Sequence, residues 1–215
     1  MNNKIIVYGA SGHALVVADI IRQAGKYEVV GFIDDVNTQS HGNEFCGASI
    51  LGGKEKLSEL LKSGVTYIVV AIGDCTIREK ISGFVKDIGF NLATCIHPSA
   101  VIAADVSIGE GTVISAGVVV CAGAKIGESV IVNTAASIDH ECIIGNAAHI
   151  GPGVRLGGLV TVGEKSWIGI GAVVIDRVKI GKSTIIGAGA VLLKSIGDGV
   201  VAYGVPAKHI RSKDI

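Results

Sequence analysis

The chain has 215 residues, and its 19 Lys and Arg residues balance its 19 Asp and Glu residues, which gives a formal net charge of zero. A neutral chain has no overall field that attracts nucleic acid or an anionic membrane, so we expect neither as a partner. Hydrophobic residues make up 49% of the chain, but aromatic residues only 4%. A core filled by Ile, Val, Leu and Ala suits thin, regular, β-rich packing.

Neither a membrane segment nor a disulfide framework is expected. The longest uncharged run, 111–124, is too short to span a bilayer, and the N-terminus reads as a strand followed by a helix, unlike a signal peptide. The cysteines are widely spaced without a C-x-x-C pair, which fits reduced thiols and no metal site. They are Cys46, Cys75, Cys95, Cys121 and Cys142. These features predict a cytoplasmic protein.

From Lys4 to about Phe90, short apolar runs alternate with helical patterns. We expect strands at 4–9, 27–35 and 66–74 and helices at 11–25, 54–64 and 76–89. This alternation predicts a parallel, Rossmann-like sheet of roughly four strands. The segment 37–49 is predicted to be a surface loop near a bound nucleotide.

Two features of this region suggest a nucleotide site. "GASGHA" at 9–14 joins the first strand to the first helix, where Rossmann-type folds hold a phosphate on backbone N–H groups. It reads G-x-x-G rather than G-x-G-x-x-G, so the motif alone is weak. Asp34 and Asp35 end the second strand, where a ribose-binding acid is expected. An NAD-dependent oxidoreductase would use the same positions, but about 90 residues leave no room for a second mononucleotide-binding half.

After residue 95 the sequence has a period of six. Every sixth residue from Ile96 to Leu192 is Ile, Val or Leu, and the residue four places after each is small or apolar, from Ala100 to Ala190. Three six-residue sides per turn describe a triangular parallel β-helix built from hexapeptide repeats. Six coils at β-sheet spacing would form a prism roughly 28 Å tall.

One polar stretch, 133–151, interrupts these apolar repeats. It holds His140 beside Glu141, with His149 nine residues later. The aliphatic positions of the repeat and the positions four residues after them form two inward columns, which point into the prism. All three residues lie outside these columns, so we expect them to project from the prism and not to be buried. An ordinary solvent-exposed face would also carry polar residues. A histidine beside a carboxylate, however, is the common arrangement of a general base, and we therefore predict an active site here.

Six motifs, in one order along nearly the whole chain, resemble those of bacterial nucleotide-sugar N-acetyltransferases of the bacillosamine and perosamine type and their sialic acid O-acetyltransferase relatives. They are "GASGHA" at 9–14, "GFIDD" at 31–35, "IHPSA" at 96–100, "NTAASIDHECIIG" at 133–145, "HIGPGV" at 149–154 and "YGVPAK" at 203–208. The resemblance implies a nucleotide-sugar-binding domain at 1–94 and, at 95–215, a left-handed β-helix acetyltransferase domain with a C-terminal tail. It also implies a homotrimer that uses acetyl-CoA.

The resemblance carries roles to individual residues. His140 would be the catalytic base and Glu141 the carboxylate that orients it. His149 would lie near the acetyl-CoA thioester, and Asn133 would line the same groove. Gly12 and His13 match the family's phosphate contacts, and Asp34 and Asp35 match its nucleoside contacts. Apart from the resemblance, Gly157 and Gly158 would let the pantetheine approach the backbone closely. Lys208 and Arg211 are candidate partners for the CoA phosphates, with a solvated tail as the alternative. No metal is implied.

The leading function is acetyl-CoA-dependent N-acetylation of a nucleotide-linked 4-amino-4,6-dideoxy sugar, by direct attack of the amine on the thioester. Cys142 falls in an inward column and is interpreted as packing rather than as a nucleophile. The oxyanion donor could be His149 or a backbone N–H of a neighbouring coil. Sialic acid O-acetylation and a non-catalytic nucleotide-binding solenoid remain alternatives, and the nucleotide could be UDP, GDP or dTDP.

Overall fold

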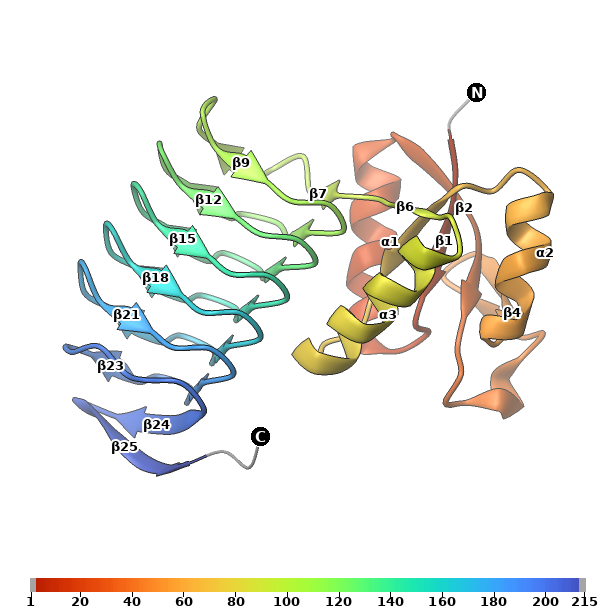
Figure 1. Cartoon of the computed structure of the whole chain (residues 1–215). Coiled ribbons are helices and arrows are strands. Elements are labelled where there is room, and N and C mark those ends of the chain that lie inside the picture. Colours follow the sequence, from red (N-terminus) through yellow and green to blue (C-terminus); the bar gives the residue numbers. More distant parts are fainter. Residues whose placement is uncertain (1–2, 213–215) are drawn as a thin grey trace. The chain divides into compact units, whose positions relative to one another are not determined.

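A computed structural model describes residues 3–212 (Figure 1). The chain divides into two compact units, with the boundary between Pro98 and Ser99. Among the described residues, no helix is long and apolar enough to cross a membrane. Each unit is described by itself below.

The first unit is a mainly parallel sheet with helices on its faces. Its elements are β1 (Asn3–Tyr8), α1 (Gly12–Ala24), β2 (Tyr27–Ile33), η1 (Thr38–Ser40), β3 (Glu44–Phe45), β4 (Ala48–Gly52), η2 (Lys54–Lys56), α2 (Leu57–Lys62), β5 (Tyr67–Val70), α3 (Cys75–Asp87), β6 (Asn91–Leu92) and β7 (Cys95–Ile96). Six strands form the sheet, in the order β3-β4-β2-β1-β5-β6. The Rossmann-like fold is confirmed, with more strands than the four expected.

The central strand explains why this unit folds as a parallel sheet. Ile5, Ile6 and Val7 of β1 are fully buried, as is typical of a parallel strand covered by helices on both faces. β1 pairs with β2 on one side and with β5 on the other, so the strand order reverses at β1. In open α/β sheets, ligands bind at the carboxyl ends of the strands beside such a reversal.

The prediction of a loop at 37–49 was wrong in part, because this segment contains η1, β3 and the first residues of β4. β3 and β4 form an antiparallel hairpin joined by Cys46 and Gly47. Both linking residues have positive φ, at 51° and 83°, as in the two-residue turns that fit the twist of a hairpin. Such turns usually carry Asn-Gly, so the Cys-Gly pair gave a weak signal.

The second unit is a solenoid of two-residue strands that recur every six residues. They are β8 (Val101–Ile102), β9 (Ser107–Ile108), β10 (Val113–Ile114), β11 (Val119–Val120), β12 (Lys125–Ile126), β13 (Ile131–Val132), β14 (Ser137–Ile138), β15 (Ile143–Ile144), β16 (His149–Ile150), β17 (Arg155–Leu156), β18 (Thr161–Val162), β19 (Trp167–Ile168), β20 (Val173–Val174), β21 (Lys179–Ile180), β22 (Ile185–Ile186) and β23 (Val191–Leu192). A hairpin of β24 (Val200–Gly204) and β25 (Ala207–Ser212) follows.

Each strand of the solenoid pairs in parallel with the third strand after it, which lies eighteen residues further along the chain. Within this unit the three sheets run β25-β24-β22-β19-β16-β13-β10, β23-β20-β17-β14-β11-β8 and β21-β18-β15-β12-β9. Val119, for example, pairs with Val101 of the preceding coil and Ser137 of the next. This is the arrangement of a left-handed β-helix, and it confirms the fold expected for this half.

The two inward columns form the core of the solenoid. Ile114, Ile138 and Ile150 of the aliphatic column are fully buried, and so are Ala136 and Cys142 of the second column. Glycines repeat at a spacing of eighteen because coils approach closely there. These glycines are Gly109, Gly127, Gly145, Gly163 and Gly181. A Cβ added to Gly163 would lie 2.5 Å from the carbonyl carbon of Gly181, too close for any side chain.

The corners of the coils share one backbone conformation. From Gly111 to Gly189, every sixth residue has a positive φ near 60°, in the left-handed region. Six of these positions are Gly, and Glu141 occupies another, with φ of 55°. A side chain in this region costs on the order of 1 kcal/mol, so Glu141 is held at a position that glycine would fill at lower cost.

Candidate active site

His140 and Glu141 lie together at one corner of a coil, between β14 and β15. Nδ1 of His140 lies 3.1 Å from Oε2 of Glu141, and both side chains are more than half exposed. An ionised carboxylate can only accept, so Nδ1 carries the proton and donates. Nε2 is then the unprotonated nitrogen and can act as a base.

Nε2 of His140 lies against the next coil at Gly158. A Cβ added to Gly158 would overlap Nε2, Cε1 and Cδ2 of the imidazole. The N–H of Gly158 donates to Oδ1 of Asp176 at 3.0 Å, and a Cβ on Gly157 would overlap that same oxygen. The structure therefore gives both glycines a role within the chain. Their proposed contact with pantetheine stays a prediction.

His149 projects from β16 but is buried, with only 7% of its surface exposed. The expectation that all three residues would be uncovered was therefore wrong for His149. Its ring stacks on that of Trp167, one coil further on, with centroids 5.0 Å apart and planes 8° from parallel. Nε2 of His149 lies 3.4 Å from Nδ2 of Asn133, which brings these two predicted site residues together.

Cys142 is fully buried, and its Sγ donates to the carbonyl of Gly157 at 3.2 Å. Burial raises the pKa of this thiol to about 11, above the ordinary value for cysteine. A buried thiol with a raised pKa is a poor nucleophile. The interpretation of Cys142 as a packing residue is therefore consistent with its environment.

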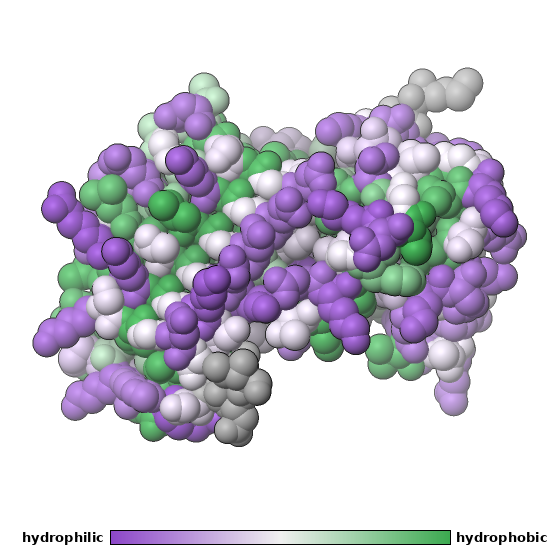
Figure 2. All heavy atoms as spheres, in the orientation of Figure 1, coloured by the Kyte–Doolittle hydropathy of each residue, from purple (hydrophilic) through white to green (hydrophobic). Residues whose placement is uncertain are grey.

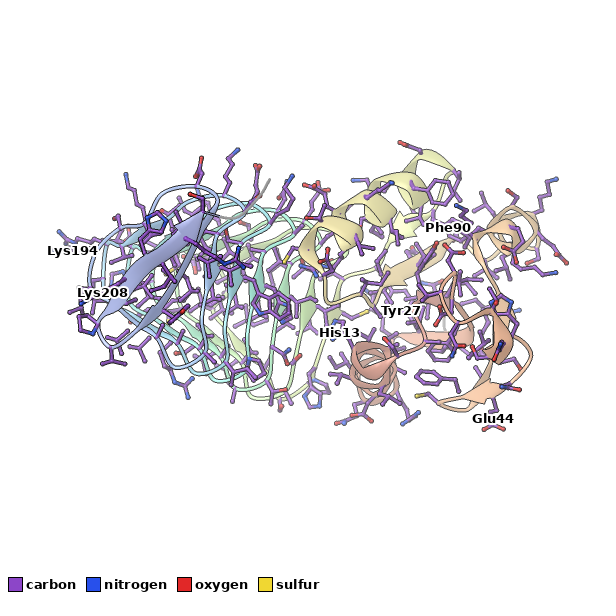
Figure 3. All side chains as sticks on the ribbon, turned by 90° about the horizontal axis from the view of Figure 1, so that it is seen from below. His13, Tyr27, Glu44, Phe90, Lys194 and Lys208 are labelled. Atoms are coloured by element: carbon purple, nitrogen blue, oxygen red, sulfur yellow. The ribbon has the colours of Figure 1, made fainter. Side chains whose placement is uncertain are left out.

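Lys208 and Arg211 lie on β25, the last strand of the solenoid, and both are exposed. Figure 3 labels Lys208. Four strand spacings, through β19, β22 and β24, separate β25 from His149 on β16, which amounts to roughly 19 Å. The structure thus places the two basic residues away from the histidines, at the far end of the same sheet.

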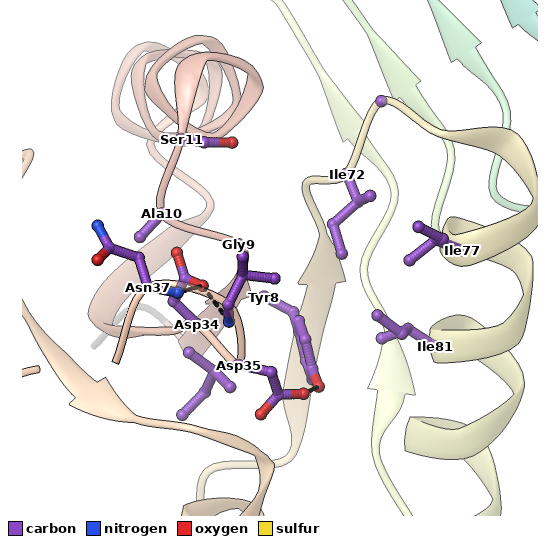
Figure 4. Close-up of a pocket in the computed structure, with 13 residues that line it drawn as sticks. Tyr8, Gly9, Ala10, Ser11, Asp34, Asp35, Asn37, Ile72, Ile77 and Ile81 are labelled. Carbon is purple, nitrogen blue, oxygen red and sulfur yellow. Dashed lines mark hydrogen bonds between the residues drawn. The ribbon is translucent and has the colours of Figure 1, made fainter. Parts of the chain in front are cut away.

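The first unit has a cavity of about 350 Å³ at the carboxyl ends of β1, β2 and β5 (Figure 4). Its walls are mostly apolar, and Asp34 and Asp35 supply the charge. The lining residues are Tyr8, Gly9, Ala10, Ser11, Ile33, Asp34, Asp35, Val36, Asn37, Ile72, Gly73, Ile77 and Ile81. The cavity lies where the strand order reverses, as a nucleotide site in such a sheet should.

The two carboxylates of this cavity are held differently. Oδ1 of Asp34 accepts the backbone N–H groups of Val36 and Asn37, at 2.8 and 3.0 Å. Asp35 accepts the N–H of Lys54 at 2.7 Å on one oxygen and the hydroxyl of Tyr8 on the other. Burial, followed by the bond to Asp35, raises the pKa of Tyr8, so its hydroxyl stays protonated. Tyr8 thus anchors Asp35, a role that the sequence did not reveal.

Gly12 and His13 open α1, next to the cavity but outside its lining. The N-cap residue Ser11 makes no side-chain capping bond, which leaves the first turn without that partner for its N–H groups. Nε2 of His13 is buried without a hydrogen-bond partner. Burial, with a smaller contribution from Arg78, lowers the pKa of His13 to about 4, so the ring is uncharged at neutral pH.

Comparisons with known proteins agree with this architecture. Residues 4–83 match the family model of the PglD N-terminal domain, and residues 160–194 match that of the bacterial transferase hexapeptide repeats. The chain is 39% identical to perosamine N-acetyltransferase from Caulobacter crescentus, solved in complex with CoA and GDP-perosamine. That match covers 97% of this chain and 98% of the other, with a TM-score of 0.93.

Two further solved structures are similar over nearly their whole length. The acetyltransferase domain of PglB from Neisseria gonorrhoeae, in complex with acetyl coenzyme A, is 38% identical. The match covers 98% of this chain and 100% of that one, with a TM-score of 0.89. WeeI from Acinetobacter baumannii is 27% identical over 97% of this chain and 100% of its own, with a TM-score of 0.84.

Proposed function

Because the chain belongs to the hexapeptide-repeat acetyltransferases that carry a PglD-type N-terminal domain, we propose that it transfers the acetyl group of acetyl-CoA to a nucleotide-linked 4-amino-4,6-dideoxy sugar. The relatives solved with CoA, acetyl-CoA and GDP-perosamine support the co-substrate and the substrate class. One observation of this chain carries the assignment of the base. The bond of Nδ1 to Glu141 leaves Nε2 of His140 as the basic nitrogen.

The proposed reaction needs one base and no covalent enzyme intermediate. The amine nitrogen of the sugar attacks the thioester carbonyl, and a carbon–nitrogen bond forms as the carbon–sulfur bond breaks. The proton released by the amine passes to Nε2 of His140 and then to the thiolate sulfur of CoA. The products are the acetamido sugar and free CoA. Glu141 stabilises the imidazolium between these two steps.

The two units divide the binding of the substrates. We assign the nucleotide to the cavity of the first unit, with Asp34 and Asp35 toward the nucleoside and the first turn of α1, at Gly12 and His13, toward the phosphates. Because His13 is uncharged, it would contact a phosphate as a hydrogen-bond donor and not as a cation. A sugar held by its remote nucleotide loses little further entropy on reaching the thioester.

Acetyl-CoA is assigned to the solenoid. Asn133 and His149 would lie near the thioester, Gly157 and Gly158 along the pantetheine, and Lys208 and Arg211 at the phosphates. The separation of roughly 19 Å between His149 and β25 suits a cofactor laid lengthwise across the coils. Since acetyl-CoA and nucleotide sugars are made in the cytoplasm, we place the reaction there.

We propose that the active enzyme is a homotrimer with the site shared between subunits. Figure 2 shows apolar surface on the solenoid between rows of hydrophilic side chains. Exposed apolar residues of this unit include Val101, Val119, Ile143, Ile170, Val173, Ile175 and Leu193. Val101, Val119 and Val173 project from strands of one sheet, which gives that sheet a face suited to a second copy.

Complementation tests the shared site. Chains with His140→Ala and chains with Lys208→Ala plus Arg211→Ala are mixed, unfolded and refolded together, and assayed at acetyl-CoA well below KM, where both variants alone are slow. If each site takes its base from one subunit and its phosphate contacts from another, some mixed sites regain activity. A fully active monomer, measured by light scattering at assay concentration, contradicts the proposal.

The reaction itself is tested by thiol release from acetyl-CoA with a panel of GDP-, UDP- and dTDP-linked amino sugars and with free sialic acid. We expect release with a nucleotide-linked 4-amino sugar, and a product that resists hydroxylamine because it is an amide. A hydroxylamine-sensitive ester formed on sialic acid indicates the O-acetyltransferase alternative. Nucleotide binding without thiol release from any acceptor indicates a non-catalytic solenoid.

A further inference from the structure

The structure fixes which nitrogen of His149 carries the proton, starting from the orientation of Asn133. Oδ1 of Asn133 accepts the backbone N–H of Thr134 at 2.8 Å. A backbone N–H can only donate, so the amide oxygen of Asn133 must face Thr134 and Nδ2 must face the other way. The orientation of this amide therefore follows from its backbone partner.

Nδ2 of Asn133 lies 3.4 Å from Nε2 of His149, a long hydrogen bond. Since Nδ2 is a donor, Nε2 must be the acceptor and cannot carry a proton. A neutral imidazole with an unprotonated Nε2 carries its proton on Nδ1. The chain from Thr134 through Asn133 thus selects the Nδ1–H tautomer of His149.

A second contact fixes the plane of the ring. Trp167, which is 42% exposed, lies directly after His149 in the register of the sheet and stacks on it almost in parallel. The preceding neighbour in the register is Ile131, which is fully buried. A ring between these two side chains cannot turn out of its plane without losing the stacking contact.

We propose that Trp167 is a positioning residue, which holds the His149 ring in the plane where Nε2 accepts from Asn133 and the proton is on Nδ1. Nε2 of His149 then accepts from Asn133, whereas Nε2 of His140 is left to act as a base. Both histidines thus carry the proton on Nδ1, the one because a carboxylate accepts from Nδ1 and the other because an amide donates to Nε2. The contribution to turnover rests on the proposed function, but the tautomer does not.

The tautomer is measured by nitrogen NMR of the full chain labelled at its six histidines, with the signals of His149 assigned by their loss in His149→Gln. We expect a protonated Nδ1 and an unprotonated Nε2. Asn133→Asp keeps an acceptor for Thr134 but turns an acceptor toward Nε2, so Nε2 should become protonated. A wild-type protein with its proton on Nε2, or an Asn133→Asp variant without a change, overturns the assignment.

Two substitutions distinguish the effect of the flat aromatic ring of Trp167 from the effect of its volume. Trp167→Phe keeps a flat face and should keep the Nδ1–H signature and kcat within about three-fold. Trp167→Leu keeps apolar bulk without a flat face, and it should give averaged His149 signals and a kcat lowered by about ten-fold or more, as for other partners that orient a histidine. KM for the nucleotide sugar should not change.

The outcomes distinguish the positioning of His149 by Trp167 from the proposed acetyltransferase function. If Trp167→Leu keeps both the wild-type signals and the wild-type kcat, Trp167 does not position His149. If the signals behave as expected but no amino sugar is acetylated by any variant or by the wild type, the tautomer stands and the proposed function fails.

Discussion

Gly158 makes room for the imidazole of His140, since a Cβ at position 158 would overlap its Nε2. The two residues are eighteen positions apart and lie on successive coils. We expect Gly158→Ala to push the ring away from its place. The atom in the way is the far end of an exposed side chain, so stability should change little, whereas kcat should fall by about ten-fold or more. Steady-state kinetics and thermal unfolding measure the two effects.

Gly163→Ala is the matched control. There the added Cβ would meet the backbone of Gly181 and Lys182, at 2.5 Å, which cannot move aside as a side chain can. This variant should lose stability and should not show a selective loss of kcat in the protein that remains folded. Equal kcat for Gly158→Ala and wild type contradicts the proposed place of His140.

Much of the fold was accessible from the sequence because its signals are periodic. Seventeen aliphatic residues at a spacing of six specify the solenoid, and the strand–helix alternation specifies the first unit. The hairpin at Cys46 and Gly47 was missed because its turn does not use the common residue pair. The propensity of single residues carries too little information for such short strands.

The site was harder to predict because its contacts join coils eighteen residues apart. The pair of His140 and Glu141 could be predicted because the two residues are adjacent in the sequence. The stacking of Trp167 on His149 could not be predicted. The six-residue period indicates which way a side chain points, but not which side chain of the next coil packs against it. Gly157 and Gly158 were interpreted as positions where pantetheine approaches the backbone, which stays a prediction. The sequence did not reveal that a side chain at these positions would also overlap Asp176 or His140.

Glu141 offers a test of function against stability. Its φ of 55° favours glycine, so Glu141→Gly should be more stable than Glu141→Ala by about 1 kcal/mol. Both substitutions remove the carboxylate that orients His140, and both should lower kcat by roughly ten-fold. Urea unfolding and kinetics of the pair check this. A kcat near that of wild type for both variants would show that the carboxylate does not matter to turnover.

The phosphate contacts assigned to Lys208 and Arg211 predict a selective effect on the cofactor. Replacing both by Ala should raise KM for acetyl-CoA by roughly ten-fold, because charge-assisted bonds to phosphate are lost. KM for acetyl-dephospho-CoA, which lacks one phosphate, should rise less. Lys194→Ala is the control, since Lys194 is also an exposed lysine near the C-terminal end of the solenoid (Figure 3). Equal changes for the control and the double variant reject the assignment.

His13 predicts a pH dependence of stability. Its pKa is about 4 in the folded protein and about 6.5 in the unfolded chain, so between these values the unfolded state binds the extra proton. Stability therefore rises with pH across this window and is constant above it as far as His13 is concerned. Between pH 5 and pH 7 the contribution is about 2 kcal/mol.

Urea unfolding at these two pH values, for wild type and His13→Gln, isolates this contribution from those of other groups. The wild type should gain more stability than the variant on going from pH 5 to pH 7. An equal gain in both proteins means that His13 is not held neutral by burial.

The most direct test of the account is kcat of His140→Ala measured across roughly pH 6 to 9 with a nucleotide-linked 4-amino sugar. Loss of a general base should lower kcat by on the order of a hundred-fold or more, with KM for acetyl-CoA almost unchanged. The fold should survive, because the His140 side chain is 54% exposed and lies outside the aliphatic core. The deficit should shrink toward high pH, where free amine is already plentiful. A kcat near that of wild type over the whole range would show that His140 is not the base.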